Sequence, residues 1–164
     1  MSIQSVLGFD LETTGVSDHM TVLECAVSVV RPDFTEYDHQ RWVLGWDPAD
    51  LVWDSPEVEA QHKRTGLLDE VYSTKLECTS VDSALVSYIS KHWPNPTSKP
   101  MLFGFSVHHD WYWMRTWFPR AHSMIHYRVI DVSSIREARK VFCAEHRGAH
   151  DISAAVREMR EILC

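Results

Sequence analysis

The chain has 164 residues, of which 45% are hydrophobic and 24% charged, and this composition is typical of a folded domain rather than a disordered chain. We expect a single domain that spans residues 1–164. The net charge of −7, from 16 basic and 23 acidic residues, argues against the long basic track of proteins that grip extended nucleic acid. A nucleic-acid enzyme with this charge would contact few phosphate groups, or bound metal ions would supply the positive charge.

The sequence indicates neither a membrane segment nor secretion. No apolar run approaches the roughly 20 residues that cross a bilayer. The opening stretch MSIQSV lacks a basic segment followed by an apolar one, so we expect no membrane partner and a cytoplasmic location. Four cysteines are scattered without a CxxC pair, which predicts reduced thiols rather than a zinc site or disulfides. They are Cys25, Cys78, Cys143 and Cys164.

The first half of the chain predicts strands followed by helices. Apolar or alternating runs predict three strands, at residues 5–11, 21–30 and 36–44. After a loop over residues 46–56, Ser55 and Pro56 resemble an N-cap and a first helical residue, which predicts a helix over residues 57–64. Residues 79–93 carry apolar side chains at helical spacing and predict an amphipathic helix.

The second half alternates strands and helices. Strands are predicted at residues 101–105 and 127–132, and helices at residues 110–118, 134–142 and about 150–163. Either Ser133 or Ser134 could cap the helix that follows the last strand. Three strands followed by alternating helices and strands predict an α/β domain with a mixed sheet, whose first three strands are antiparallel.

Two acidic residues lie near the end of the first strand, in GFDLETTG at residues 8–15. Asp10 and Glu12 share one face, because side-chain direction repeats every two residues. We expect Asp110 and Asp151 to begin helices, where functional groups collect in such sheets. Four carboxylates in one pocket could not all ionise without cations. Two Mg²⁺ or Mn²⁺ ions, roughly 3.5–4 Å apart, would balance this charge and clamp the oxygens of a phosphodiester.

Such a site needs a base that deprotonates the attacking water. His146 lies five residues before Asp151, in HRGAHD, and an imidazole suits this task near neutral pH. His150 and His109 are the alternatives for this role.

The four motifs resemble those of the DEDD superfamily of 3′-to-5′ exonucleases, in the branch with a catalytic histidine, and most closely those of oligoribonucleases. The resemblance rests on FDLETTG (9–15), GFSVHHD (104–110), HYRVIDVSSI (126–135) and HRGAHDI (146–152). It covers residues 6 to about 160. It implies a ribonuclease H-like, DnaQ-like fold, a homodimer, and very short RNA as the substrate, cut to mononucleotides.

By this resemblance, Asp10, Glu12, Asp110 and Asp151 hold the metal ions and His146 is the general base. Val16 stands where a hydrophobic wedge separates two bases, and His62 touches the substrate near its 3′ end. The 5′ phosphate would be capped by a set of residues that two subunits share: Ser106, Tyr127, Arg128, Ser133 and Ser134. Trp53 or a neighbour would help to hold a base.

Two other functions stay open. The connection from Val141 to His146 is very short for this family, which favours a DnaQ-like 3′-to-5′ exonuclease that trims longer single-stranded DNA or RNA. A catalytically silent nucleotide-binding module would have lost a metal ligand, whereas all four are present. The aromatic residues Trp111, Trp113 and Trp117 could stack on bases, but at helical spacing we expect them to pack in the core.

Overall fold

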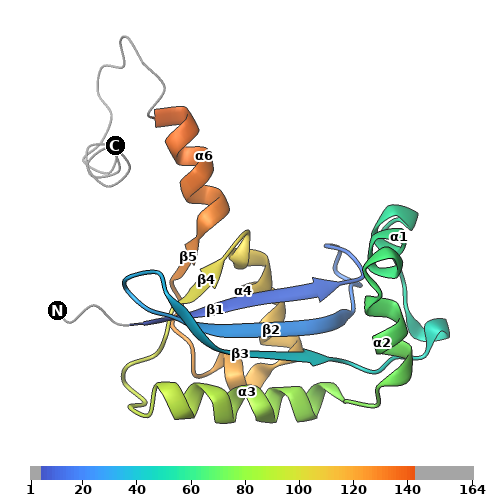
Figure 1. The fold of residues 1–164 in the computed structure, drawn as a ribbon, viewed down its shortest axis with the longest axis horizontal. Coiled ribbons are helices and arrows are strands. Elements are labelled where there is room, and N and C mark those ends of the chain that lie inside the picture. The colour runs from blue at the N-terminus through green and yellow to red at the C-terminus, as the bar shows by residue number, and fades with distance from the viewer. Residues whose placement is uncertain (1–4, 143–164) are drawn as a thin grey trace.

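A five-stranded mixed sheet organises the protein (Figure 1). The computed structural model describes residues 5–142. The strands are β1 (Val6–Thr13), β2 (Val22–Val30), β3 (Glu36–Val43), β4 (Leu102–Gly104) and β5 (Val129–Asp131), in the spatial order β3-β2-β1-β4-β5. The pairs β1–β2 and β2–β3 are antiparallel, whereas β4 pairs in parallel with both β1 and β5. This is the α/β architecture with a mixed sheet that the sequence predicts.

The helices flank the sheet and its ends. They are η1 (Pro48–Asp50), α1 (Pro56–Thr65), α2 (Leu67–Ser73), α3 (Cys78–His92), α4 (Val107–Trp117), α5 (Pro119–His122) and α6 (Val132–Phe142). In Figure 1, α3 runs along one face of the sheet, α1 and α2 lie at the end toward which β1 points, and α6 extends away from the sheet. No helix within residues 5–142 is both long enough and apolar enough to cross a membrane.

Most elements predicted within residues 5–142 are confirmed, and the helix predicted over about 150–163 lies outside the described residues. The short helices η1 and α5 were not predicted, and three further differences bear on the site. The helix α2 was not predicted; it follows Gly66, whose left-handed backbone, with φ of 82°, ends α1. The helix α4 begins three residues earlier than expected, so Asp110 lies in its first turn and does not open it. The helix α6 is capped by Asp131, whose carboxylate accepts the backbone N–H groups of Ser133 and Ser134, so neither serine is the cap.

The pleat of the sheet separates the core from the acidic residues. In β1, Leu7 and Phe9 are buried, and Phe9 lies opposite the buried Val27 of β2. These side chains belong to the main core together with residues of α3 and α4. Asp10 and Glu12 alternate with them and therefore face the other side of the sheet.

The expectation that three tryptophans pack in the core is confirmed. Trp113 is buried in the main core, and Trp111 and Trp117 pack against it, so all three act in packing. Cys25 is buried, Cys78 is half-buried, and both are free thiols.

A close approach of two backbones fixes the position of α4. A Cβ atom on Gly104, the last residue of β4, would lie 2.7 Å from the carbonyl oxygen of Phe9. A side chain there would push β4 away from β1. Because α4 begins three residues later, Gly104 keeps Asp110 against the strand of Asp10 and Glu12.

Candidate active site

Three carboxylates lie on neighbouring elements near the carboxyl ends of β1 and β4. Asp10 and Glu12 lie on β1, and Asp110 lies in the first turn of α4, shortly after β4. The Oδ1 atom of Asp110 accepts a 3.1 Å hydrogen bond from the backbone N–H of Leu11. Because β1 and β4 are parallel neighbours, their carboxyl ends lie at the same edge of the sheet, which is the usual place for functional groups in such folds.

The pKa of each of these carboxyl groups is raised. Burial is the main cause for Asp110, followed by the charge of Asp10, and together they raise its pKa to about 7. Burial also raises the pKa values of Asp10 and Glu12, and the charge of Asp10 adds to the shift at Glu12. The pKa of a carboxyl group rises in this way when the group is buried and when other negative charges lie nearby. A cation at this edge would favour the ionised form of all three groups.

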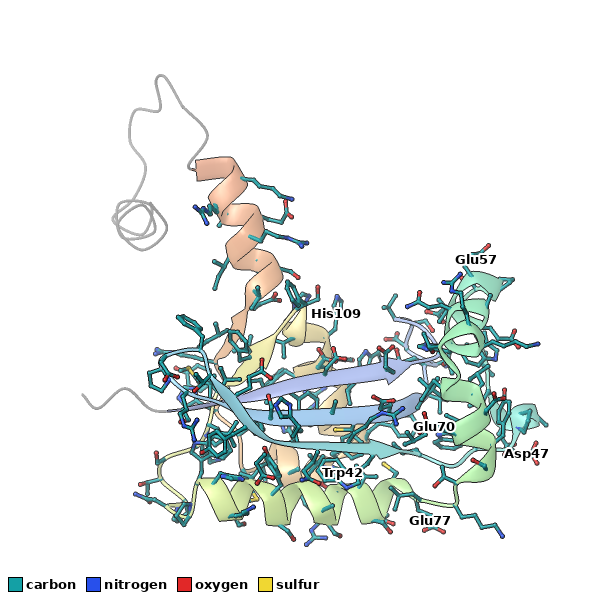
Figure 2. All side chains as sticks on the ribbon, in the orientation of Figure 1. Trp42, Asp47, Glu57, Glu70, Glu77 and His109 are labelled. Atoms are coloured by element: carbon teal, nitrogen blue, oxygen red, sulfur yellow. The ribbon has the colours of Figure 1, made fainter. Side chains whose placement is uncertain are left out.

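A further carboxylate faces these acids across the β1–β2 ladder. Glu24 lies directly opposite Glu12, and after burial its charge contributes to the raised pKa values of Asp10 and Glu12. The guanidinium of Arg41 lies 2.6 Å from Glu24 and also makes bonds of 2.7 and 3.0 Å to Glu70 of α2, which is labelled in Figure 2. Arg41 thus balances Glu24 and ties the sheet to α2.

These side chains fit a divalent cation by donor type and by charge. Carboxylate oxygens are the ligands that Mg²⁺ and Mn²⁺ prefer. Within residues 5–142, no group of three or more His, Cys, Asp or Glu side chains is close enough to hold a metal ion. The fourth predicted ligand, Asp151, and the predicted base, His146, lie outside the described residues, as does the alternative base His150. The other alternative, His109, is exposed in the first turn of α4 (Figure 2).

His62 lies against the end of β1. Its side chain is only 6% exposed, its Nε2 is 2.9 Å from the carbonyl oxygen of Thr13, and its Nδ1 is 3.8 Å from the carboxylate of Glu12. An imidazole that hydrogen-bonds a carbonyl through Nε2 carries its proton there, so Nδ1 presents a lone pair toward Glu12 when the ring is neutral. The structure thus places His62 beside the acids, and its contact with substrate stays a prediction. Trp53 is its aromatic neighbour, with ring centroids 5.9 Å apart.

Val16 projects from the turn after β1, with 75% of its surface exposed. Asp54 holds this turn: its carboxylate accepts the backbone N–H groups of Val16 at 2.6 Å and Ser17 at 2.9 Å. A Cβ atom on Gly15 would lie 2.1 Å from the Asp54 side chain, so glycine is required for this approach. An exposed apolar side chain on a fixed turn is suited to the predicted wedge role.

The predicted 5′-phosphate residues fall into two groups in one chain. Ser106 and Ser133 meet, with their hydroxyl oxygens 3.2 Å apart, and Ser134 lies in the same turn of α6. Tyr127 and Arg128 lie before β5, where the Arg128 guanidinium sits 5.3 Å from the centre of the Tyr127 ring. The strand β5 separates the two groups, and Tyr127 is 68% exposed.

Sequence reasoning did not single out several residues that organise this region. Asp131 and Asp54 act through backbone hydrogen bonds, and Glu24 and Arg41 act through the register of β1, β2 and β3. Asp131 had one signal, its place just before two serines at a helix start, but that pattern offers three capping residues and does not choose among them.

The mixed sheet and its helices define an α/β protein of the ribonuclease H-like class, with acidic residues where its central strand ends. The chain is 31% identical to the oligoribonuclease of Mycobacterium bovis over 166 residues, which cover 92% of this chain and 76% of that relative. It is 30% identical to the oligoribonuclease of Nocardia farcinica over 172 residues, covering 97% and 79% of the two chains. The chain belongs to the oligoribonuclease family.

More distant relatives agree with this membership. A probable oligoribonuclease of Schizosaccharomyces pombe is 27% identical over 171 residues, covering 96% of this chain and 66% of that relative. No family model matches the chain, so the membership rests on these relatives. The resemblance read from the four motifs, and with it the expectation of an enzyme of the exoribonuclease class, is confirmed.

Proposed function

We propose that this protein is a metal-dependent 3′-to-5′ exoribonuclease that degrades very short RNA, from dinucleotides to pentamers, to nucleoside 5′-monophosphates. The observation that carries the proposal is the bond between Asp110 and Leu11, which holds a third carboxylate against the strand of Asp10 and Glu12. Burial and then the charge of Asp10 raise the pKa of Asp110 to about 7, and a cation beside it would favour the ionised form. The name of the relatives, oligoribonuclease, supports short RNA as the substrate.

In this proposal, Asp10, Glu12, Asp110 and Asp151 would hold two divalent ions, Mg²⁺ or Mn²⁺. Such ions, when bound, lower the pKa of a bound water and stabilise charge on the phosphate oxygens. His146 accepts the proton of the attacking water. The oxygen of the water bonds to the phosphorus of the last linkage, and the bond from that phosphorus to the preceding 3′ oxygen breaks. The 3′ oxygen takes up a proton from solvent and becomes a hydroxyl, and the phosphate stays on the 5′ carbon of the released nucleotide. The Asp110–Leu11 bond orients one acid of this set.

We propose further that a homodimer completes the pocket for the 5′ phosphate. Tyr127 and Arg128 precede β5, whereas Asp131 and Ser133 follow it. At about 3.3 Å per residue, the strand β5 sets Arg128 and Asp131 about 10 Å apart. A phosphate held by Ser106 and Ser133 of one subunit would therefore meet Tyr127 and Arg128 of another. A single terminal phosphate also needs no long basic groove, which agrees with the net charge of −7.

A second candidate keeps the acids and changes the substrate. A groove of about 570 Å³ crosses the open face of the sheet beside Asp10, and Ser28, Arg41 and Phe103 help to line it. A groove that extends from Asp10 over the open face has room for further nucleotides, which favours a DnaQ-like exonuclease acting on longer single-stranded DNA or RNA.

The test is the cleavage of labelled RNA of two to about twenty nucleotides, with Mn²⁺ or Mg²⁺ and with a chelator. Our proposal expects the dinucleotide to be consumed fastest and the chelator to stop the reaction. Trimming of long strands with accumulation of dinucleotides would support the second candidate. Full activity in the presence of the chelator would contradict both.

A further inference from the structure

A buried carboxylate lies at the centre of the proposed 5′-phosphate pocket. Asp131 is the last residue of β5 and is 9% exposed. Its Oδ1 atom accepts three backbone N–H groups, from Ser106 at 3.1 Å, Ser133 at 2.9 Å and Ser134 at 3.3 Å. Its Oδ2 atom is hydrogen-bonded to the Nδ1 atom of His108. One side chain thus joins the start of α4 to the start of α6.

This arrangement fixes where the two serine hydroxyls lie. The Ser133 hydroxyl oxygen is 3.1 Å from the Ser106 backbone nitrogen, whose N–H it shares with Asp131, and 3.2 Å from the Ser106 hydroxyl oxygen. Ser106 has a φ of 51°, a left-handed conformation that is uncommon for a residue other than glycine. A conformation of this kind persists where surrounding bonds impose it. The bond from Ser106 to Asp131 is one of these.

The same bonds decide which donors could meet a phosphate. The backbone N–H groups of Ser106, Ser133 and Ser134 are engaged by Asp131, so recognition would fall to side chains. Besides the two hydroxyls, His108 borders the pocket with 55% of its side chain exposed. Because its Nδ1 is bonded to Asp131, its Nε2 lies on the opposite edge of the ring, away from the carboxylate.

A carboxylate beside a phosphate pocket must itself be balanced. Burial opposes the ionisation of Asp131, but the bonds from His108 and from the backbone of Ser134 and Ser133 outweigh it and hold the pKa below its usual value. The charge of Asp131 is thus met by donors within the protein, which limits its repulsion of a bound phosphate.

We propose that Asp131 is the positioning residue of the terminal-phosphate pocket, and that it holds Ser106, Ser133 and His108 as one set of donors that selects a substrate with a 5′ phosphate. This inference rests on the proposed function.

The test is the terminal-phosphate preference: kcat/KM for a dinucleotide with a 5′ phosphate, divided by kcat/KM for the same dinucleotide with a 5′ hydroxyl. Asp131→Asn keeps the size of the side chain but weakens its hold on four donors. We expect the preference to fall by about 10-fold, because the charge-assisted bonds that Asp131 makes within the protein are weakened only around the pocket for the 5′ phosphate. A ratio of two substrates on one enzyme is insensitive to the fraction of folded protein.

Asp82→Asn is the matched control. Asp82 is 5% exposed and accepts the backbone N–H groups of Arg120 at 3.2 Å and Ala121 at 2.9 Å, at the start of α5 and away from the pocket. It should lower stability as Asp131→Asn does and leave the preference unchanged. A preference that is equally unchanged in Asp131→Asn would overturn the role of Asp131.

The preference of the wild type separates this inference from the proposed pocket. A wild-type preference near one would overturn the proposed 5′-phosphate pocket, and with it this inference. A clear wild-type preference that is unchanged in Asp131→Asn would overturn the inference alone. Should Asp131→Asn fail to fold, His108→Ala replaces an exposed partner of the same carboxylate. We expect it to lower the preference about threefold, which corresponds to one weak hydrogen bond, and an unchanged value would again overturn the inference.

Discussion

The carboxylate of Asp110 accepts a hydrogen bond from the backbone N–H of Leu11, the residue between Asp10 and Glu12. The bond joins two residues that lie 99 positions apart in the chain, and it holds Asp110 against the strand of the other two acids. It depends on the parallel pairing of β1 with β4, which Gly104 permits by carrying no side chain. The geometry of the candidate active site therefore follows from backbone packing, and the acids gather there despite their mutual repulsion.

The variant Asp110→Asn tests whether Asp110 is needed for cleavage when the fold is kept. Asp110→Asn keeps an oxygen that can accept the Leu11 N–H but removes a charge that the proposed metal ions require. Partners outside the ligand shell of a metal contribute roughly 10–100-fold, so loss of a ligand should lower kcat/KM by at least about 100-fold. Cleavage of a dinucleotide and Mn²⁺ binding by calorimetry measure the two effects, and circular dichroism checks the fold. Wild-type cleavage by a variant that no longer binds Mn²⁺ would contradict the proposal.

The raised pKa of Asp110 predicts how the metal-free protein responds to pH. The unfolded chain releases this proton near pH 3.8, whereas the folded chain holds it up to about pH 7, so the folded state binds more protons in between. Its free energy of unfolding should therefore fall as pH rises from about 4 to 7, by up to about 4 kcal/mol. Urea unfolding with chelator measures this slope. Asp110→Asn should flatten it, and Mn²⁺ should stabilise the wild type more at pH 8 than at pH 5.

The sequence predicts the acidic strand well because its information is local. The alternation of Leu7 and Phe9 with Asp10 and Glu12 is the two-residue period of a strand with one buried face, and the structure has that period. The helix α2 was missed because seven residues are too few to show helical periodicity.

The residues that organise the site were harder to predict, since their roles depend on contacts between distant segments. Glu24 matters because the strand register sets it opposite Glu12, and no local pattern fixes a register. Asp54 supports a turn that ends 37 residues before it in the chain. Asp131 binds Ser106 from another element, and a sequence pattern cannot show such a bond.

A second carboxylate predicts a loss of stability in acid. Asp38 has a left-handed φ of 51°, and its carboxylate accepts bonds of 2.7 Å from both Lys91 and His92 of α3. These bonds, that from Lys91 first, lower its pKa to about 2, so its contribution is complete above pH 4 and is lost as pH falls through 2. Asparagine tolerates this backbone. Asp38→Asn should lower the urea midpoint at pH 7, and the difference from wild type should shrink toward pH 2. A constant difference would contradict this account.

Arg41 balances Glu24, which suggests a variant that adds negative charge to the site. The Glu24 side chain is 14% exposed, and Arg41→Gln leaves it without its cation. We expect the free energy of unfolding to fall by about 1–3 kcal/mol, and Mn²⁺ to bind more tightly because the charge of Glu24 is no longer offset. Glu70→Gln is the control, since it removes only the exposed half of the network and should lower stability by less than about 1 kcal/mol. Unchanged Mn²⁺ affinity in Arg41→Gln would show that the charge of Glu24 does not act on the proposed metal site.

The division of the 5′-phosphate residues by β5 predicts complementation between subunits. If Ser133 of one subunit and Arg128 of another form each pocket, then Ser133→Ala and Arg128→Ala dimers are both defective on 5′-phosphorylated dinucleotides. In a mixed dimer, one pocket carries both changes and the other carries neither. Random exchange of subunits makes half of the dimers mixed, so about a quarter of all pockets should be intact. The measurement is activity after the two variants are unfolded and refolded together, with each variant refolded alone as the control. Activity no greater than the average of the two variants would show that each pocket is built within one chain.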